Sequence, residues 1–552
     1  MFKQVFVNLL LSLVIVIMSA CSSKDSDSPT KLPNSRTGAP FVTIWKTDNP
    51  GYTADNQILI STDHTKGNFS IDWGDGTIQD NLSYDNQHTY SVAGTYRVKI
   101  YGDFPRISFD NSDKDNQKLL AIESWGDIPW KTMYFAFSDC INLELNATDQ
   151  PDLKDVIDMG GMFYNASNMN GEIGDWNTTN IRNMWFLFYG ATSFNKDISH
   201  WDTSHVNNMW SMFYNASSFN QPIGIWDTSN VIDMGFMFSG ASNFNQNIEN
   251  WHTENVTTMY SMFQDATAFN QPIGAWDTAA VTDMGWMFNG ASDFNQSIEN
   301  WHTENVTTMG SMFQDATAFN QPIGTWNTAA VTDISFIFNG ASDFNQSIKN
   351  WHTENVTSMH AMFQYATAFN QPIGAWNTAA VTDMGWMFYK ASDFNQNIEN
   401  WNTAKVTTMH AMFYDVITFN QPIGAWETSA VTNMAFMFHG DLIFNQDIGG
   451  WDTTNVTNMH TMFQDNAAFN QDLSRWITTN VTDMAYMFND ASAFDQDISN
   501  WDTANVTTMA NMFSTAVAFT NHDLSGWNVL NVTDHADFLT GAGTGNAEPI
   551  WP

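Results

Sequence analysis

Methionine and histidine, whose side chains can be metal or haem ligands, recur in this sequence at regular spacings. Met234 and Met237 form a Met-x-x-Met pair of a kind found in almost every repeat of the chain, and thioether sulfur is a soft ligand. His252, His302 and His352 lie 50 residues apart. In a stack of coils this is about 10 Å, too far to share one metal held at about 2 Å. We therefore predict that the Met pairs pack in a core, that these histidines are solvated, and that neither set holds a metal.

A second group of candidate ligands lies nearer the N-terminus. Asp72, Asp75 and His88 carry carboxylates and an imidazole, so a metal cluster is one interpretation of this segment. The other interpretation is structural, because Asp-Gly pairs are ordinary residues of hairpin turns. We favour the structural interpretation.

Aromatic residues occupy one position between the two Met positions in alternate repeats, while the intervening repeats carry Ser, Ala or Thr there. One interpretation is packing of large rings over small neighbours. The other is a ladder of rings about 10 Å apart, suited to stacking on a polysaccharide or gripping a protein partner. The candidate ligand-binding residues of this aromatic edge are Phe236, Trp286, Phe336, Trp386, Phe436 and Tyr486.

A 25-residue repeat must position these side chains. Trp recurs every 25 residues from Trp176 to Trp501, and one inserted residue precedes Trp527. Within one repeat, apolar residues at offsets 0, 3, 6 and 7 from Val456 predict a short helical or 3₁₀ segment, and short β-rich segments on either side predict strands. One repeat cannot bury its own apolar face, so neighbours must stack. The sequence therefore predicts an α/β repeat solenoid of short strands and short helical turns.

Residues 41–105 have a different pattern. Short apolar or alternating runs, such as Phe41–Trp45 and Gln57–Ile60, are separated by Gly, Asn and Asp clusters and predict a small all-β sandwich. The motifs Trp-Gly-Asp-Gly-Thr at 73–77, His-Thr-Tyr at 88–90 and Gly-Thr-Tyr at 94–96 resemble those of PKD-like domains. We expect residues 106–150 to be a linker and N-terminal cap coil, 151–526 the repeat solenoid, and 527–552 a C-terminal cap.

The N-terminus predicts export. A basic Lys3, an apolar stretch over 5–18 and Met-Ser-Ala-Cys at 18–21 resemble a bacterial lipoprotein signal, with residues 1–20 as the signal peptide and Cys21 as the lipidated N-terminus. A plain secretory signal with an accidental cysteine is the alternative. Residues 21–40 are polar, as expected for a disordered tether, and their acidic residues indicate display at the outer membrane. The predicted location is therefore the bacterial cell surface, with the lipid anchor as the membrane contact.

Charge and cysteine content exclude other classes. The chain has 19 Lys and Arg against 58 Asp and Glu, a formal net charge of −39. This charge would repel nucleic acid. Two cysteines exclude a disulfide framework, and Cys140 falls at a position where other repeats carry a small buried Ala. No cofactor is expected, although structural calcium, which would relieve the charge repulsion, stays open.

The repeat itself resembles a known family. Phe-Asn-Gln-Pro-Ile-Gly-x-Trp-Asp-Thr and the residues that follow it over 219–242 are similar to the repeat of BspA-like leucine-rich-repeat surface lipoproteins. That resemblance implies a leucine-rich-repeat-like fold, a role in adhesion to a host or matrix protein or a polysaccharide, and no catalytic residues. Catalysis needs one unique site, whereas every polar residue type here is copied from repeat to repeat. We predict a non-catalytic, surface-anchored binding protein; the alternative is a passive surface layer or spacer without a specific ligand.

Overall fold

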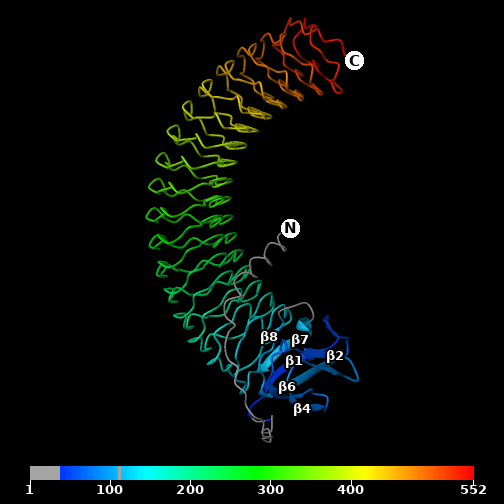
Figure 1. The fold of residues 1–552 in the computed structure, drawn as a ribbon, viewed down its shortest axis with the longest axis vertical. Helices are drawn as coiled ribbons and strands as arrows, with labels where there is room; N and C mark the ends of the chain where they lie inside the picture. The colour runs from blue at the N-terminus through cyan, green and yellow to red at the C-terminus, as the bar shows by residue number, and fades with distance from the viewer. Residues whose placement is uncertain (1–35, 37, 110–113) are drawn as a thin grey trace, which may run out of the picture.

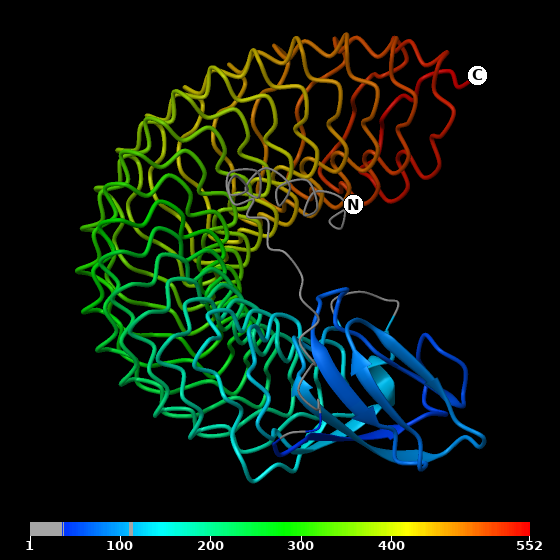
Figure 2. The ribbon, with the colours of Figure 1, turned by 60° about the horizontal axis from the view of Figure 1, so that its bottom comes forward.

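A computed structural model describes residues 36, 38–109 and 114–552 of the 552. The repeats stack as coils along a crescent, and a β module lies at its N-terminal end (Figure 1). Figure 2 shows the sheet of this module set against the first coils. Within the described ranges no helix is long and apolar enough to cross a membrane. The predicted signal peptide, Cys21 and most of the predicted tether lie outside these ranges.

The β module contains two sheets. A six-stranded sheet has the order β4-β3-β6-β1-β7-β8, and β2 pairs with β5 separately. All pairs are antiparallel except β7 with β8, which is parallel. The strands are β1 (Phe41–Lys46), β2 (Gln57–Ile60), β3 (Asn68–Asp72), β4 (Ile78–Leu82), β5 (Asn86–Thr89), β6 (Thr95–Asp103), β7 (Leu119–Ser124) and β8 (Glu144–Leu145), with a 3₁₀ turn η1 (Asn116–Lys118) before β7.

The six-stranded sheet also starts the coil stack. β7 and β8 lie within the predicted linker and cap segment of 106–150, yet both belong to this sheet. β7 pairs antiparallel with β1 on one side and parallel with β8 on the other. Trp125, directly after β7, stacks on Phe41 of β1 at 5.7 Å and contacts Trp176 of the coils at 5.3 Å between ring centroids. The core is therefore continuous from the sheet into the coils.

Each coil is numbered here from its Trp, so that Trp251 is position 1 and Trp276 is position 1 of the next coil. Backbone hydrogen bonds join neighbouring coils along positions 8–15, which we call the ladder. The N–H groups at positions 9, 11, 13 and 15 donate to the carbonyls at positions 8, 10, 12 and 14 of the following coil. In the coil of Trp251 these bonds are Met259 to Asp283 (3.1 Å), Ser261 to Gly285 (2.9 Å), Phe263 to Met287 (2.9 Å) and Asp265 to Asn289 (2.7 Å).

The predicted α/β, leucine-rich-repeat-like class is wrong. No α-helix occurs in the described residues, and η1 is their one helical turn. Positions 9–16 form consecutive turns in which position 11 is left-handed, as at Phe236 (φ 56°) and Ser261 (φ 52°). In an α-helix the N–H groups bond within the segment. Here the left-handed residue directs alternate N–H groups to the neighbouring coil instead. The predicted strands are reduced to one isolated parallel bridge per coil, at position 8.

The coil interior is a set of aromatic columns. Positions 1, 6, 9, 12, 13, 16, 19 and 23 point inward and are almost all buried, including Met234 and Met237, which are fully buried. The Phe rings at position 13 stack at 5.7 Å between Phe263 and Phe288. Cys140 fills an Ala position, is fully buried, and has its thiol pKa raised by that burial. These columns supply the apolar burial that one coil lacks.

The opposite side of each coil is joined mainly by side chains. The indole of Trp276 donates to the Ile248 carbonyl at 3.1 Å, and the amide oxygen of Asn245 accepts from the Asn270 N–H at 3.0 Å. Asn245 and Asn270 belong to a column of Asn at position 20, whose side chains bridge neighbouring coils from outside the core. The Trp rings stack at 6.4 Å, as between Trp276 and Trp301.

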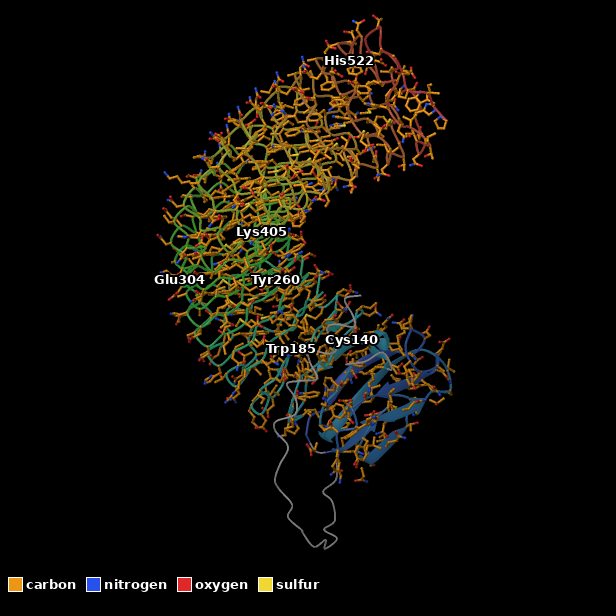
Figure 3. The ribbon with its side chains drawn as sticks, turned by 45° about the horizontal axis from the view of Figure 1, so that its top comes forward. Cys140, Trp185, Tyr260, Glu304, Lys405 and His522 are labelled. Carbon is orange, nitrogen blue, oxygen red and sulfur yellow. The ribbon has the colours of Figure 1, made fainter. Side chains whose placement is uncertain are left out.

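The difference between the two sides accounts for the curvature. A backbone ladder holds neighbouring strands about 4.8 Å apart, whereas the Trp column opposite repeats at 6.4 Å. The stack must therefore bend toward the ladder. Figure 3 shows Glu304 (position 4) at the outer edge of the crescent and Trp185 and Tyr260 (both position 10) toward the hollow. The ladder thus forms the concave face.

One core position breaks the pattern. Position 16 is Ala in most coils, but Asp441 and Asn466 occupy it in two successive coils, and both are fully buried. Neither carboxylate oxygen of Asp441 has a well-formed hydrogen bond to any described residue, although the N–H groups of Ile443 and Phe444 lie near it. Burial therefore raises the pKa of Asp441 well above its usual value.

Replacing this residue by the repeat's usual one, Asp441→Ala, should stabilise the protein at pH 7 by about 1–3 kcal/mol, since it removes a buried polar group with poor partners. A carboxyl whose pKa is raised by folding loses stability as pH rises above the unfolded-state value of about 4. The gain should therefore be larger at pH 7 than at pH 4. Urea unfolding of both proteins at the two pH values measures it. A gain that does not change with pH would contradict the assignment.

Candidate functional site

The concave face consists of the outward side chains of the ladder, at positions 8, 10, 11, 14 and 15. The inward side chains at positions 9, 12, 13 and 16 are buried, so these five positions are the ones that meet solvent along the inside of the crescent. Because the coils stack in register, each position forms a row that runs along the crescent. Between them, positions 10 and 11 supply an aromatic residue in most coils.

The aromatic edge expected from the sequence lies on this face. Trp286 is 37% exposed and Tyr486 is 36% exposed. The other four rings of the edge, Phe236, Phe336, Trp386 and Phe436, are half-buried. The rings are thus neither core residues nor free in solvent.

Sequence reasoning missed the rings that lie between them. In most coils with a small residue at position 11, position 10 carries a ring, so most coils contribute one ring in a zigzag; the coil of Trp301, with Gly310 and Ser311, contributes none. Ring centroids lie 5.1 Å apart between Phe236 and Tyr260, and 5.4 Å apart between His410 and Phe436. We call this row the ring strip; it comprises Trp210, Phe236, Tyr260, Trp286, Phe336, His360, Trp386, His410, Phe436, His460 and Tyr486. The sequence does show the alternation of large and small residues between positions 10 and 11, and this alternation could have identified the additional rings.

Carboxylates flank the ring strip on both sides. Position 15 contributes Asp265, Asp315, Asp415, Asp465 and Asp490, and position 8 contributes Asp233, Asp283, Asp333, Asp383 and Asp483. Lys390 is the only Lys or Arg at positions 8–15 between residues 151 and 526. Burial, and then the like charge of Asp315, raise the pKa of Asp265. The face therefore combines apolar rings with an excess of negative charge.

The histidines of the strip pair with these carboxylates. His360 lies 3.3 Å from Asp383 and His460 lies 3.2 Å from Asp483, in each case between Nδ1 and Oδ1. His410 faces Asn433 instead, and burial lowers its pKa. Across the ranges that the structure describes, no three His, Cys, Asp or Glu side chains are grouped so that they could hold a metal ion.

A second aromatic row occupies position 14. Tyr389 stacks on Tyr414 at 4.5 Å, and Tyr414 stacks on His439 at 4.2 Å. Tyr164, Tyr189 and Tyr214 form a similar run near the N-terminal end of the stack, at 4.6 and 4.4 Å. We call the first set the tyrosine row. The sequence does carry a signal for this row, because the aromatic residues at position 14 recur in three successive coils. This row was not predicted from the sequence.

The remaining predicted candidates lie away from this face. His252, His302 and His352 are exposed at position 2. In the β module, Oδ1 of Asp75 accepts the Thr77 N–H (2.8 Å) in a turn, and Oδ2 contacts Nε2 of His88 at 2.8 Å.

Asp72 instead accepts the Gly74 N–H of the same turn and pairs with Lys99 at 3.4 Å, and it makes no contact with His88. The three residues are therefore held by turn and ion-pair contacts.

Comparison with known families finds one match. The family described as "Mycoplasma protein of unknown function, DUF285" matches residues 131–248, 221–325, 273–373, 313–416, 395–477 and 443–550, which overlap along the whole coil stack. No curated protein and no solved structure matches the chain.

The exposure of the strip can be tested by hydroxyl-radical oxidation followed by peptide mass spectrometry. Trp286 should be oxidised at least several-fold faster than Trp301, which is 3% exposed at the start of the next coil and serves as the internal control. Equal rates at the two residues would show that the ring of Trp286 is not on the surface.

Proposed function

We propose that this chain, which belongs to the DUF285 family of proteins of unknown function, is a non-catalytic binding protein whose concave face holds the ligand. The observation that carries the proposal is the ring strip. Apolar ring surface left in contact with water forgoes the free energy that its burial would supply, and exposed aromatic rows are a common feature of binding surfaces. The flanking carboxylates add hydrogen-bond acceptors beside each ring.

The passive spacer is the alternative, and the ring strip argues against it. A spacer needs only the ladder and the buried columns. Small polar residues suffice on the outside of such a stack, as the Ser and Thr at position 17 show. Rings at positions 10 and 11 add nothing to the ladder, whose bonds are made by the backbone.

A binding role also fits the distribution of polar groups better than catalysis does. The imidazole–carboxylate pairs of His360 and His460 are copies of each other 100 residues apart. An active site requires one arrangement of distinct groups around a reacting atom. Repeated copies instead suit a long ligand, a polysaccharide or an extended protein surface such as a host or matrix protein.

We further propose that the chain is a lipoprotein displayed on the bacterial cell surface, at the outer membrane. The support is the sequence Met-Ser-Ala-Cys at 18–21 after an apolar stretch, followed by a polar segment long enough to separate the folded body from the membrane. The crescent would then face outward.

The lipid anchor is tested by Cys21→Ser. The unsubstituted protein should fractionate with membranes and incorporate labelled fatty acid, whereas the variant should do neither, because the acylated thiol is gone. Ser22→Ala, at the neighbouring residue, is the control and should keep both properties. Fatty-acid labelling that survives Cys21→Ser would contradict lipidation at this residue.

The binding function is tested by titrating the full chain on an array of glycans and extracellular-matrix proteins, with and without calcium. A saturable partner should bind the double variant Trp286→Ala, Trp386→Ala about tenfold more weakly, a loss of about 1.4 kcal/mol. The control is Ile225→Ala, which should bind normally. Ile225 is exposed and occupies position 25 of its coil, which is not part of the concave face. Absence of saturable binding across the array would favour the spacer.

A further inference from the structure

The coils between residues 401 and 475 depart from the repeat at one corner. Positions 16–18 read Ala, then Ser or Thr, then a small or polar residue in most coils. In three successive coils they read Val-Ile-Thr at 416–418, Asp-Leu-Ile at 441–443 and Asn-Ala-Ala at 466–468. We call this segment the repeat break. Position 17 loses its hydroxyl once more, at Val517 in the coil of Trp501, but only in the repeat break do adjacent coils change together. In a chain built from near-identical copies, a change shared by adjacent coils identifies a feature that the stack itself does not require.

The repeat break changes the hydroxyl bonds between coils. The hydroxyl of Thr367 at position 17 donates to the Ser342 carbonyl at 3.3 Å, and Ser392 donates to Thr367 at 3.4 Å. Ile417 and Leu442 occupy this position in the next two coils and cannot donate. In the Ile417 coil the hydroxyl of Thr418 donates to the Ser392 carbonyl instead, at 2.7 Å, whereas Leu442 and Ile443 offer no hydroxyl in the coil that follows. Ile417 and Leu442 are also 45% and 48% exposed, so burial of their side chains adds little stability. The bond lost at Leu442 is therefore not offset.

The substitutions create an exposed aliphatic patch. Ile443, beside Leu442, is 45% exposed, and Ile417 lies one coil away at the same position as Leu442. In the described coils of 176–500, no other place exposes three large aliphatic side chains on adjacent coils. Beneath the patch, the core carries the poorly bonded Asp441, a second cost at the same place. Departures that lower stability are concentrated at functional sites.

The aliphatic patch adjoins the tyrosine row of the concave face. His439 of that row precedes Leu442 by three residues, and Tyr414 precedes Ile417 by three. Tyr365, at position 15, extends the row and is 44% exposed. Tyr365 and Lys390 are left-handed, with φ of 58° and 59°, at a position where most other coils use Gly, Asn or Asp. Bulky residues are disfavoured in that conformation, so this part of the row also carries a backbone cost.

The stacking within the row indicates the kind of partner. Tyr414 has one ring face covered by Tyr389 and the other by His439, so the row presents ring edges and hydroxyl groups. A sugar ring needs an open aromatic face for stacking, whereas side chains of a polypeptide pack against ring edges and aliphatic groups. This geometry favours a polypeptide over a glycan.

Charge further restricts the partner. Asp415 and Asp465 lie on either side of His439, at 3.7 and 3.6 Å from its ring nitrogens. Burial lowers the pKa of His439, so the imidazole contributes little positive charge. Lys390 lies 3.9 Å from Asp415 and offsets part of its charge, whereas among the described residues the ion-pair contact of Asp465 is with His439 alone. A second copy of this chain, with its own formal charge of −39, would be repelled. Lys or Arg side chains of a different protein would be attracted.

We infer that the aliphatic patch, the tyrosine row and the carboxylates of Asp415 and Asp465 form one docking site for a polypeptide that presents an aliphatic side chain beside a basic one. The inference rests on the proposed binding function and localises one protein contact within it. Because the repeat break occurs once, this site has a stoichiometry of one partner per chain, whereas the ring strip is extended.

The test uses fluorescence anisotropy with short synthetic peptides in four sets that carry Leu and Arg, Leu and Glu, Ser and Arg, or Ser and Glu. The full-length protein should bind the Leu and Arg set tightest, at one site per chain. The double variant Ile417→Thr, Leu442→Ser restores the repeat, so it should fold normally and bind that set at least tenfold more weakly. Ile232→Thr, which also replaces an exposed Ile by the Thr usual at its position, is the control and should bind normally.

Two results would overturn the inference. One is binding of the Leu and Arg set that is unchanged in the Ile417, Leu442 double variant; the other is no preference among the four sets. Both are distinguishable from failure of the proposed function, which is judged by the Trp286, Trp386 double variant on glycans and matrix proteins. Loss of peptide binding in the repeat-break variant with retained glycan or matrix binding would separate the two sites.

Discussion

The inter-coil ladder at positions 8–15 is the constraint from which the rest of this structure follows. It fixes the spacing of the coils on one side at the distance that backbone hydrogen bonds allow. The other side, where indole and amide side chains bridge the coils, repeats at 6.4 Å between Trp rings. A stack with two unequal sides must curve, and the shorter side becomes concave. The face that carries the ring strip is therefore concave because it is the hydrogen-bonded side.

The zigzag of the ring strip changes how much of each ring is covered. Rings at the same position of adjacent coils stack face to face, as Tyr389 and Tyr414 do at 4.5 Å, and so cover each other's faces. Alternation between positions 10 and 11 separates them sideways, as with Tyr260 and Phe236, whose centroids are 5.1 Å apart at an interplanar angle of 62°. The small partner residues, Gly235 beside Phe236 and Ser261 beside Tyr260, leave the room for this arrangement. Packing and exposure are thus compatible on one face: each ring rests on its neighbours and keeps part of its surface in solvent.

The sequence predicted the period, the stacking and the buried columns, because these depend on which residues recur and a 25-residue copy makes that visible. It failed on the secondary structure. Offsets of 0, 3, 6 and 7 place side chains on one side of a helical turn and equally on one side of the turns seen here. The deciding feature, a left-handed backbone at position 11, falls on Phe, Trp, Ser and Ala, none of which signals that conformation. The ring strip was predicted only in part. From the sequence we considered the rings at position 11, whereas the strip alternates between positions 10 and 11.

Nearest-neighbour stacking also explains how such a chain can hold a specific site without rebuilding its fold. Each coil contacts only the coils on either side, so the cost of an altered residue stays within two interfaces. The hydroxyl bond lost at Leu442 is worth roughly 1 kcal/mol, while the ladder bonds of the repeat break, such as Phe413 to Met437 at 3.0 Å, are kept. The hydroxyl row resumes with Ser492, which donates to the Ala467 carbonyl at 3.4 Å. A globular core would transmit such changes in every direction. A stack confines them, and this leaves its outer positions free to diverge from the repeat wherever binding requires it.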